Sequence, residues 1–215
     1  METFLCSAVL FDLDGVLVDS TRSVERQWRI WAGEHGVDPE AILEIVHGRR
    51  TVEVIRLLAP HLEVEAEVAR VEQSESEDTN GVEVMPGASK LLATIPDSGW
   101  AVVTSGTNLL ARARLRHAGL PIPNVLVSAE HVREGKPHPE PYLTGAHLLG
   151  VPAPQCLVIE DAPAGIESAH AARMKAIGLT STFSADQLKA EAVIRDLRHL
   201  HLQARDGMLE VKVRA

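Results

Sequence analysis

Two aspartates near the N-terminus have the residue type and spacing for catalysis. Asp12 and Asp14 follow the apolar run 8–11, and Gly15 follows them at once. A carboxylate at the end of a buried strand costs free energy unless a cation or a proton lies beside it. Their spacing suits one carboxylate acting as nucleophile while the other carries a proton. Taken alone, the pattern is also typical of a turn or a helix cap.

Residues suited to an anion follow two later apolar runs. Ser105 and Gly106 would supply a hydroxyl group and free backbone N–H groups before a helix, which together form an anion pocket. The alternative is an ordinary helix N-cap. Lys136 lies in a loop that Pro137 and Pro139 would stiffen, so that its ammonium group could be held in place. The alternative is a solvated lysine.

A second pair of carboxylates, Glu160 and Asp161, ends the apolar run 156–159. Mg²⁺ takes oxygen ligands of this kind, although a cap for a helix that begins near Pro163 is the alternative. Open parallel sheets bind ligands outside the carboxyl ends of their strands, where all four groups would meet. Together they supply what phosphoryl transfer needs: a nucleophile, metal ligands, anion donors and one lysine.

Short apolar segments alternate with helical patterns and predict the elements that position these residues. The predicted strands are 8–11, 100–104, 124–128, 156–160 and 175–179. The predicted helices are 87–96, 108–118, 140–149 and 163–172. Near-continuous apolar strands between amphipathic helices indicate a parallel sheet covered on both faces. The predicted fold class is therefore α/β, with a doubly wound, Rossmann-like core.

Residues 21–84 interrupt this alternation, because they carry helical patterns and no convincing strand. We therefore predict an α-helical cap domain over 21–84, inserted into a core formed by 1–20 and 85–215.

Three further patterns predict structure rather than chemistry. Val24, Trp28 and Trp31 have helical spacing and are predicted to belong to a core. The acidic segment 63–78 is predicted to be a solvated helix face. The alternating tail 208–213 is predicted to add an edge strand.

Composition limits the classes of function. The chain has 215 residues, of which 45% are hydrophobic and 24% charged, as in an ordinary soluble protein. Its net charge of −9 argues against nucleic-acid binding. Cys6 and Cys156 lie in apolar runs and are expected to be buried, reduced thiols. No basic leader and no apolar run long enough for a bilayer is present, so we expect a cytoplasmic location without membrane contact. We also expect a monomer.

The four motifs, in this order, make the chain similar to phosphatases of the haloacid dehalogenase type. The matching segments are Asp12-Leu13-Asp14-Gly15, Val103-Thr104-Ser105-Gly106, Gly135-Lys136-Pro137 and Glu160-Asp161. The helical insertion resembles the small cap of that family. From about residue 7 to 180 the sequence most resembles bacterial sugar and sugar-alcohol phosphatases and yeast 2-deoxyglucose-6-phosphate and glycerol-phosphate phosphatases.

The resemblance implies a role for each carboxylate. Asp12 would attack phosphorus and form an aspartyl-phosphate, while Asp14 would protonate the leaving oxygen and later take a proton from water. Mg²⁺ would be held by Asp12, the backbone carbonyl of Asp14 and Asp161, with Glu160 nearby or bound through water. The metal would screen the repulsion between the nucleophile and an anionic phosphate.

The same resemblance assigns the phosphate and the leaving group to other residues. Ser105, the N–H of Gly106 and Lys136 would hold the phosphoryl oxygens. In the cap, the residues expected to face the substrate are His47, Arg49, Arg50 and Thr51. Start of a helix at Thr51 and ordinary surface arginines are the alternatives. The aromatic content of 3% argues against a base-stacking pocket, so a small phosphorylated sugar or polyol is the expected substrate.

Three other functions compete with this interpretation. Sugar-phosphate mutases resembling β-phosphoglucomutase carry a histidine ten residues after the second aspartate of the first motif. Val24 occupies that position here, which favours a hydrolase. A phosphatase for another small phosphate, such as phosphoglycolate, stays open. A non-catalytic regulator would have lost Asp12, Asp14, Lys136 or Asp161, and all are present.

Overall fold

A six-stranded parallel sheet forms the centre of the molecule in the computed structural model, which describes residues 2–205 and 207–214. The strand order is β6-β5-β2-β7-β8-β9, and every neighbouring pair is parallel. The strands are β2 (Ala8–Phe11), β5 (Trp100–Val103), β6 (Leu126–Val127), β7 (Cys156–Glu160), β8 (Lys175–Leu179) and β9 (Ala192–Ile194). All residues of β2, β5 and β7 are buried, as their near-continuous apolar sequences predict. The predicted α/β class is confirmed.

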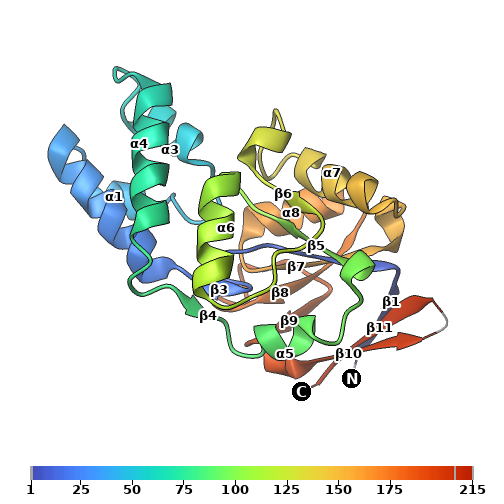
Figure 1. Cartoon of the computed structure of the whole chain (residues 1–215). Helices are drawn as coiled ribbons and strands as arrows, with labels where there is room; N and C mark the ends of the chain where they lie inside the picture. Colours follow the sequence, from blue (N-terminus) through green and yellow to red (C-terminus); the bar gives the residue numbers. More distant parts are fainter. Residues whose placement is uncertain (1, 206, 215) are drawn as a thin grey trace.

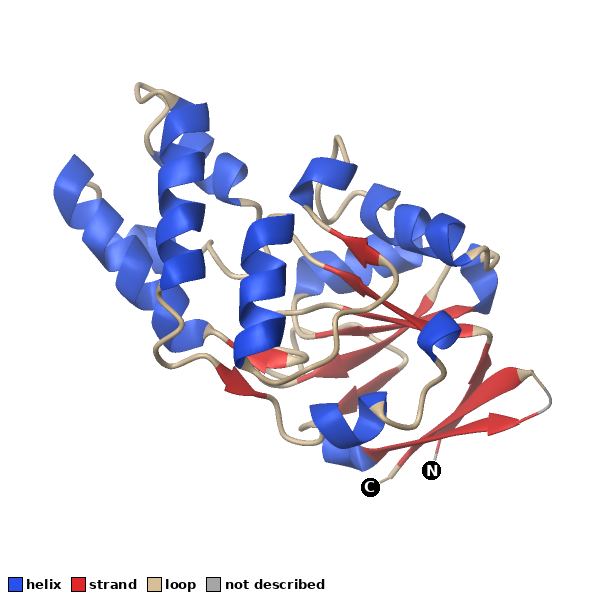
Figure 2. Cartoon of the chain, viewed as in Figure 1, coloured by secondary structure: helices blue, strands red, loops and turns tan. Residues whose placement is uncertain are grey.

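Helices cover both faces of this sheet (Figure 2). Consecutive residues of β2 point to opposite faces of the sheet. Leu10 packs with α7 (Glu140–Leu149) and α8 (Pro163–Ala171), whereas Phe11 belongs to the cluster with α5 (Ala88–Leu92) and α6 (Asn108–His117). Four short 3₁₀ helices complete the connections: Asp97–Gly99, Ala129–His131, Ala153–Gln155 and Leu197–His199. Among the described residues, no helix combines the length and the apolar character needed to cross a membrane.

Two predicted elements are shorter than their sequence patterns suggested. α5 ends at Leu92 instead of near residue 96, because the following N–H groups of Thr94 and Ile95 bond three residues back and tighten the chain into turns. β6 comprises Leu126 and Val127 alone.

The C-terminal tail forms a strand, but not an edge strand. β11 (Met208–Val213) is the middle of a three-stranded antiparallel sheet, between β1 (Glu2–Cys6) and β10 (Leu200–Arg205). The prediction of an edge position was wrong because neither partner strand was recognised in the sequence. The pairing of Glu2 with Val213 brings the two ends of the chain side by side (Figure 1).

Four helices fill most of the segment 21–84 and form a group beside the sheet (Figure 1), and they share their own apolar core. They are α1 (Thr21–His35), α2 (Pro39–Leu43), α3 (Thr51–Leu58) and α4 (Val64–Glu77). Trp28 and Trp31 lie in this core as predicted, edge to face with ring centroids 5.5 Å apart.

The two chain connections between this helical segment and the sheet run next to each other. β3 (Val18–Asp19) and β4 (Glu83–Val84) pair as a two-stranded antiparallel ribbon. The exact division into 1–20, 21–84 and 85–215 stays a prediction, with this ribbon at both of its boundaries.

The acidic helix α4 differs from its prediction as a solvated face. Glu72 and Glu75 are each only 5% exposed, because α4 packs against α6 of the core. Arg114 of α6 pairs with Glu75, which compensates the burial of that carboxylate. Cys6 and Cys156 are buried free thiols, as predicted.

Leu10→Ala is expected to lower the free energy of unfolding by about 2–5 kcal/mol, because Leu10 is fully buried between the sheet and α7. Urea titration followed by circular dichroism measures the effect. Leu57→Ala on the cap, where the side chain is 60% exposed, is the control and should change stability by about 0.5 kcal/mol or less. Equal effects of the two substitutions would contradict the described core.

Candidate active site

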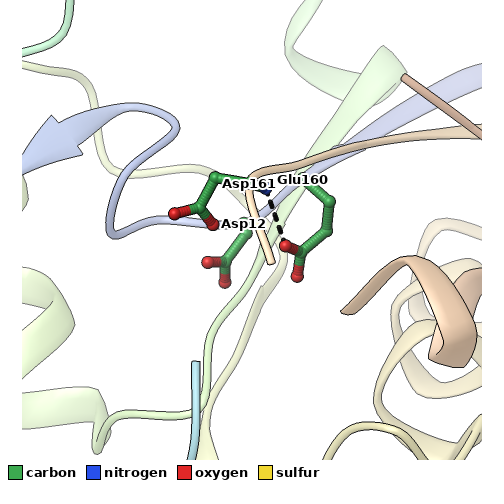
Figure 3. A group of neighbouring side chains, drawn as sticks. All are labelled: Asp12, Glu160 and Asp161. Carbon is green, nitrogen blue, oxygen red and sulfur yellow. Dashed lines mark hydrogen bonds between the residues drawn. The ribbon is translucent and has the colours of Figure 1, made fainter. Parts of the chain in front are cut away.

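The predicted chemical groups meet because three adjacent parallel strands end at one edge of the sheet. β5, β2 and β7 are neighbours, so Ser105, Asp12 and Glu160 leave the sheet together. Figure 3 shows the carboxylates of Asp12, Glu160 and Asp161 gathered at this edge. Lys136 enters from the loop before α7.

A buried lysine holds the centre of the site together. Lys136 Nζ donates to Asp12 Oδ1 at 2.7 Å, to Glu160 Oε1 at 2.8 Å and to the carbonyl oxygen of Val103 at 3.1 Å. Three acceptors match the three protons of an ammonium group. Burial alone would lower the pKa of Lys136, but the carboxylates of Asp12 and Glu160 raise it above its ordinary value. The lysine therefore stays charged and fixed.

Glu160 is occupied on both carboxylate oxygens. Oε1 accepts from Lys136 and from the hydroxyl of Tyr142 at 3.0 Å, while Oε2 accepts from the backbone N–H groups of Asp161 at 2.8 Å and Ala162 at 2.9 Å. Gly165 leaves the space for this carboxylate, since a Cβ atom there would overlap it. Glu160 is thus held by backbone N–H groups just before α8, and from there it positions Lys136.

Asp12 and Asp161 carry the negative charge that the lysine does not balance. Three carboxylates that could surround one ion, those of Asp12, Glu160 and Asp161, lie within 4.8 Å of one another. With all three carboxylates ionised, the one ammonium group leaves a buried charge of −2, which fits a divalent cation with oxygen ligands. Because Glu160 is occupied, Asp12 and Asp161 are the side chains best placed to ligate it.

The pKa values of these two carboxyls respond to the same crowding. Burial raises the pKa of Asp12 to about 7, although Lys136 opposes the rise. Burial, together with the charges of Glu160 and Asp12, raises the pKa of Asp161 well above its ordinary value. Gly15, at φ +76°, lets the chain turn without a side chain that would overlap Asp161.

Asp14 has different partners from Asp12. Its Oδ1 accepts from the hydroxyl of Ser20 at 2.7 Å and pairs with Arg114 Nη1 at 2.8 Å. Arg114 then reaches Glu75 Oε2 at 2.6 Å. Neither Arg114 nor Glu75 was expected in the site from the sequence. The available signal was a charged residue, Arg114, among Leu110, Ala111 and Leu115 on the buried side of its helix.

The groups expected to bind phosphate are bonded to the protein in this arrangement. Ser105 Oγ donates to the carbonyl oxygen of Gly48 in the cap at 2.9 Å, and the N–H of Gly106 donates to the hydroxyl of Thr104 at 3.1 Å. An anion that bound both donors would have to replace these contacts. Gly48, at φ +79°, brings the cap loop onto the core here.

A cavity lies between the cap and the strand ends. Its core wall includes Asp12, Asp14, Ser105, Gly106, Leu110 and Arg114, and its cap wall includes Val24, Trp28, His47, Gly48, Arg49, Thr51 and Glu75. Burial lowers the pKa of His47, so the imidazole is neutral at pH 7. Arg49 is exposed.

Among the four predicted cap residues, Arg50 alone does not line this cavity. Its guanidinium bonds to Glu53 at 2.6 Å and to the carbonyl oxygen of Arg133 in the core at 3.1 Å. Arg50 therefore connects the cap to the loop that carries Lys136, and its contact with substrate stays a prediction.

Comparisons with known proteins identify a family model and relatives that match most of the chain. The family model described as haloacid dehalogenase-like hydrolase matches residues 9–179. Hexitol phosphatase A of Escherichia coli is 42% identical over 201 residues, covering 91% of this chain and 93% of that protein. Glycerol-1-phosphate phosphohydrolase 2 of Saccharomyces cerevisiae is 38% identical, covering 85% and 78%.

A solved structure confirms the fold. β-Phosphoglucomutase from Clostridium difficile superposes with a TM-score of 0.81 over 91% of this chain and 93% of that chain, at 24% identity. At that identity the likeness extends to the architecture alone.

Gly165→Ala is expected to displace the Glu160 carboxylate and with it the ammonium group of Lys136, because the added methyl group would occupy the same space. The substitution should lower stability despite the higher helix propensity of alanine. Gly33→Ala in α1 is the matched control, since nothing lies within 4 Å of a Cβ there, and it should stabilise by about 0.5–1 kcal/mol. Urea denaturation compares the two. A stabilising Gly165→Ala would contradict the described packing.

The metal-free protein is expected to lose stability as pH rises. The folded-state pKa of Asp12 is about 7 and that of Asp161 is raised, so between about pH 4 and 7 the folded chain holds more protons than the unfolded chain. The urea midpoint in chelator should therefore fall from about pH 5.5 to about pH 7.5. Added Mg²⁺ should restore it at the higher pH, and Asp161→Asn should flatten the pH dependence. A pH-independent midpoint in that range would be the contrary result.

Proposed function

The chain belongs to the haloacid dehalogenase-like hydrolases, and from that premise we propose that it is a phosphatase that hydrolyses small phosphorylated sugars or sugar alcohols. The observation that carries the proposal is the buried lysine that holds Asp12, in the wall of a cavity, within a group of three carboxylates. The names of the two relatives, a hexitol phosphatase and a glycerol-phosphate phosphohydrolase, support the substrate class.

In the proposed reaction Asp12 is the nucleophile. Lys136 fixes one of its oxygens at 2.7 Å and neutralises part of its charge, so that the carboxylate keeps one orientation. Attack forms a bond from an Asp12 oxygen to phosphorus and breaks the bond from phosphorus to the substrate oxygen. Lys136, Ser105 and the N–H of Gly106 are proposed to hold the phosphoryl oxygens once the bound phosphate replaces the Ser105–Gly48 contact, the Gly106–Thr104 contact and one of the three Lys136 contacts.

Asp14 is proposed to carry the proton. It lies two residues after Asp12 and lines the same cavity. Ser20 and Arg114, which line the same cavity, hold its carboxylate. Asp14 would protonate the leaving alcohol oxygen and later accept a proton from water. The water oxygen then bonds to phosphorus and the bond from phosphorus to the Asp12 oxygen breaks, which releases phosphate and restores the Asp12 carboxylate.

A divalent cation, which we propose to be Mg²⁺, fits the acidic group. Asp12 and Asp161 would hold it together with the backbone carbonyl of Asp14, and Glu160 would lie close by. When bound, it would reduce the repulsion between the anionic nucleophile and the anionic phosphate.

Val24 favours hydrolysis over a mutase reaction. This side chain lies in the cavity wall, ten residues after Asp14, where the resemblance places a histidine in mutases of the β-phosphoglucomutase type. An apolar group there cannot exchange a proton with a sugar hydroxyl. Phosphoglycolate remains an alternative substrate, and the cytoplasmic location and monomeric state stay predictions.

Asp12→Asn is expected to lower phosphate release by about 10³-fold or more, because the amide is a poor nucleophile of nearly the same shape. Release is measured with Mg²⁺ on glycerol 1-phosphate, a hexitol phosphate and p-nitrophenyl phosphate. Asp97→Asn, an exposed aspartate away from the cavity, is the control and should retain full activity. Wild-type protein that hydrolyses none of these esters would refute the proposed function, and an active Asp12→Asn would refute the nucleophile.

A further inference from the structure

Asp14 belongs to a buried cluster of charged side chains, together with Arg114 and Glu75, and phosphoryl transfer itself does not require the last two. Arg114 of the core donates to Asp14 at 2.8 Å and to Glu75 of the cap at 2.6 Å, and the exposures of Arg114 and Glu75 are 4% and 5%. Both side chains line the cavity. The leaving group must lie beside Asp14, because Asp14 is proposed to protonate it. Arg114 and Glu75 are therefore next to the part of the substrate that differs between candidate esters.

The cluster carries no net positive charge. With both carboxylates ionised, Asp14 and Glu75 share the single guanidinium of Arg114, and one negative charge is unbalanced. With Asp14 protonated, as it must be to protonate the leaving group, Glu75 still balances Arg114. His47 is neutral and Arg49 in the same wall is exposed and screened by solvent, so neither supplies a strong partner for an anion. A second anion on the leaving group would therefore enter a poorly solvated site beside the Glu75 carboxylate without a free cation, which is unfavourable.

The hydrogen-bonding capacity of the cluster suits a hydroxyl group instead. Arg114 Nε is buried and has no hydrogen-bond partner among the described residues. A hydroxyl oxygen can accept from such an N–H while its proton is donated to a carboxylate oxygen such as those of Glu75. Val24, Trp28 and Leu110 supply apolar surface in the same cavity for the carbon chain of an alcohol.

We propose that Glu75 and Arg114 determine leaving-group specificity, accepting uncharged polyhydroxy alcohols and rejecting alcohols that carry a carboxylate. This inference rests on the proposed phosphatase function and narrows it to polyol and sugar phosphates, against phosphoglycolate. Glu75 acts on specificity from the cap, whereas the phosphate and the nucleophile are held by the core.

The test compares kcat/KM for glycerol 1-phosphate and phosphoglycolate in wild type and in Glu75→Gln. The amide keeps the shape of the side chain and one acceptor oxygen but removes the negative charge of Glu75. We expect wild type to favour glycerol 1-phosphate by more than about tenfold, and the ratio of the two kcat/KM values to fall by at least about tenfold in Glu75→Gln. The fall should include an absolute rise for phosphoglycolate. A general loss of folding or of Asp14 alignment would lower both substrates together and leave the ratio unchanged.

Glu40→Gln is the matched control, because Glu40 forms a surface pair with Arg29 on the cap at 2.8 Å and should leave the ratio as in wild type. An unchanged ratio in folded Glu75→Gln would overturn the inference. If that variant does not fold, the wild-type ratio decides: equal rates for the two esters overturn the inference while the phosphatase function stands. Absence of hydrolysis of every phosphate ester would remove the proposed function instead.

Discussion

The buried ammonium group of Lys136 is the interaction on which the site depends. It joins Asp12, which is 124 residues away in the chain, to Glu160, which is 24 residues away. A charge with 2% exposure is tolerable only with partners in hydrogen-bond contact, so the loop before α7, the end of β2 and the end of β7 have to meet at fixed positions. The parallel order β5-β2-β7 provides that meeting.

Carboxylates outnumber ammonium groups around this lysine, and the three carboxylates lie together at the strand ends. Glu160 is occupied by four donors and is fixed. Burial above all, together with the neighbouring carboxylates, raises the pKa values of Asp12 and Asp161 in the absence of a cation. Gly15 and Gly165 allow the crowding, since a side chain at either position would overlap a carboxylate. This crowding of carboxylates is the feature on which the proposed cation site rests.

The cap is connected to the core by polar contacts that surround the cavity. Ser105 bonds to Gly48, Arg50 to the carbonyl of Arg133, and Arg114 to Glu75. Each contact joins a group at a strand end, or in a loop or helix following it, to a cap residue. Movement of the cap would therefore change the surroundings of Ser105 and of Asp14 together, which is what the proposed reaction requires of a cap that excludes water.

The residue types at the strand ends, and the alternation of apolar strands with amphipathic helices, determined the α/β class and the set of groups at the site. These features could be predicted because they depend on local periodicity and on the rule that parallel strands end at one edge. Trp28 and Trp31 were predicted to lie in a core for the same reason, and they do.

Only the tertiary structure decided which charged residues are buried and what they touch. Glu75 lies in a segment whose sequence is typical of a solvated acidic helix, and Arg114 lies in an ordinary amphipathic helix. The two side chains nevertheless meet, because α4 packs on α6. β11 alternates like an edge strand but lies between β1 and β10, because it pairs with Glu2–Cys6 from the opposite end of the chain as well as with Leu200–Arg205. Such contacts join residues far apart in the chain, and local sequence is the same whether the partner is water or a distant side chain.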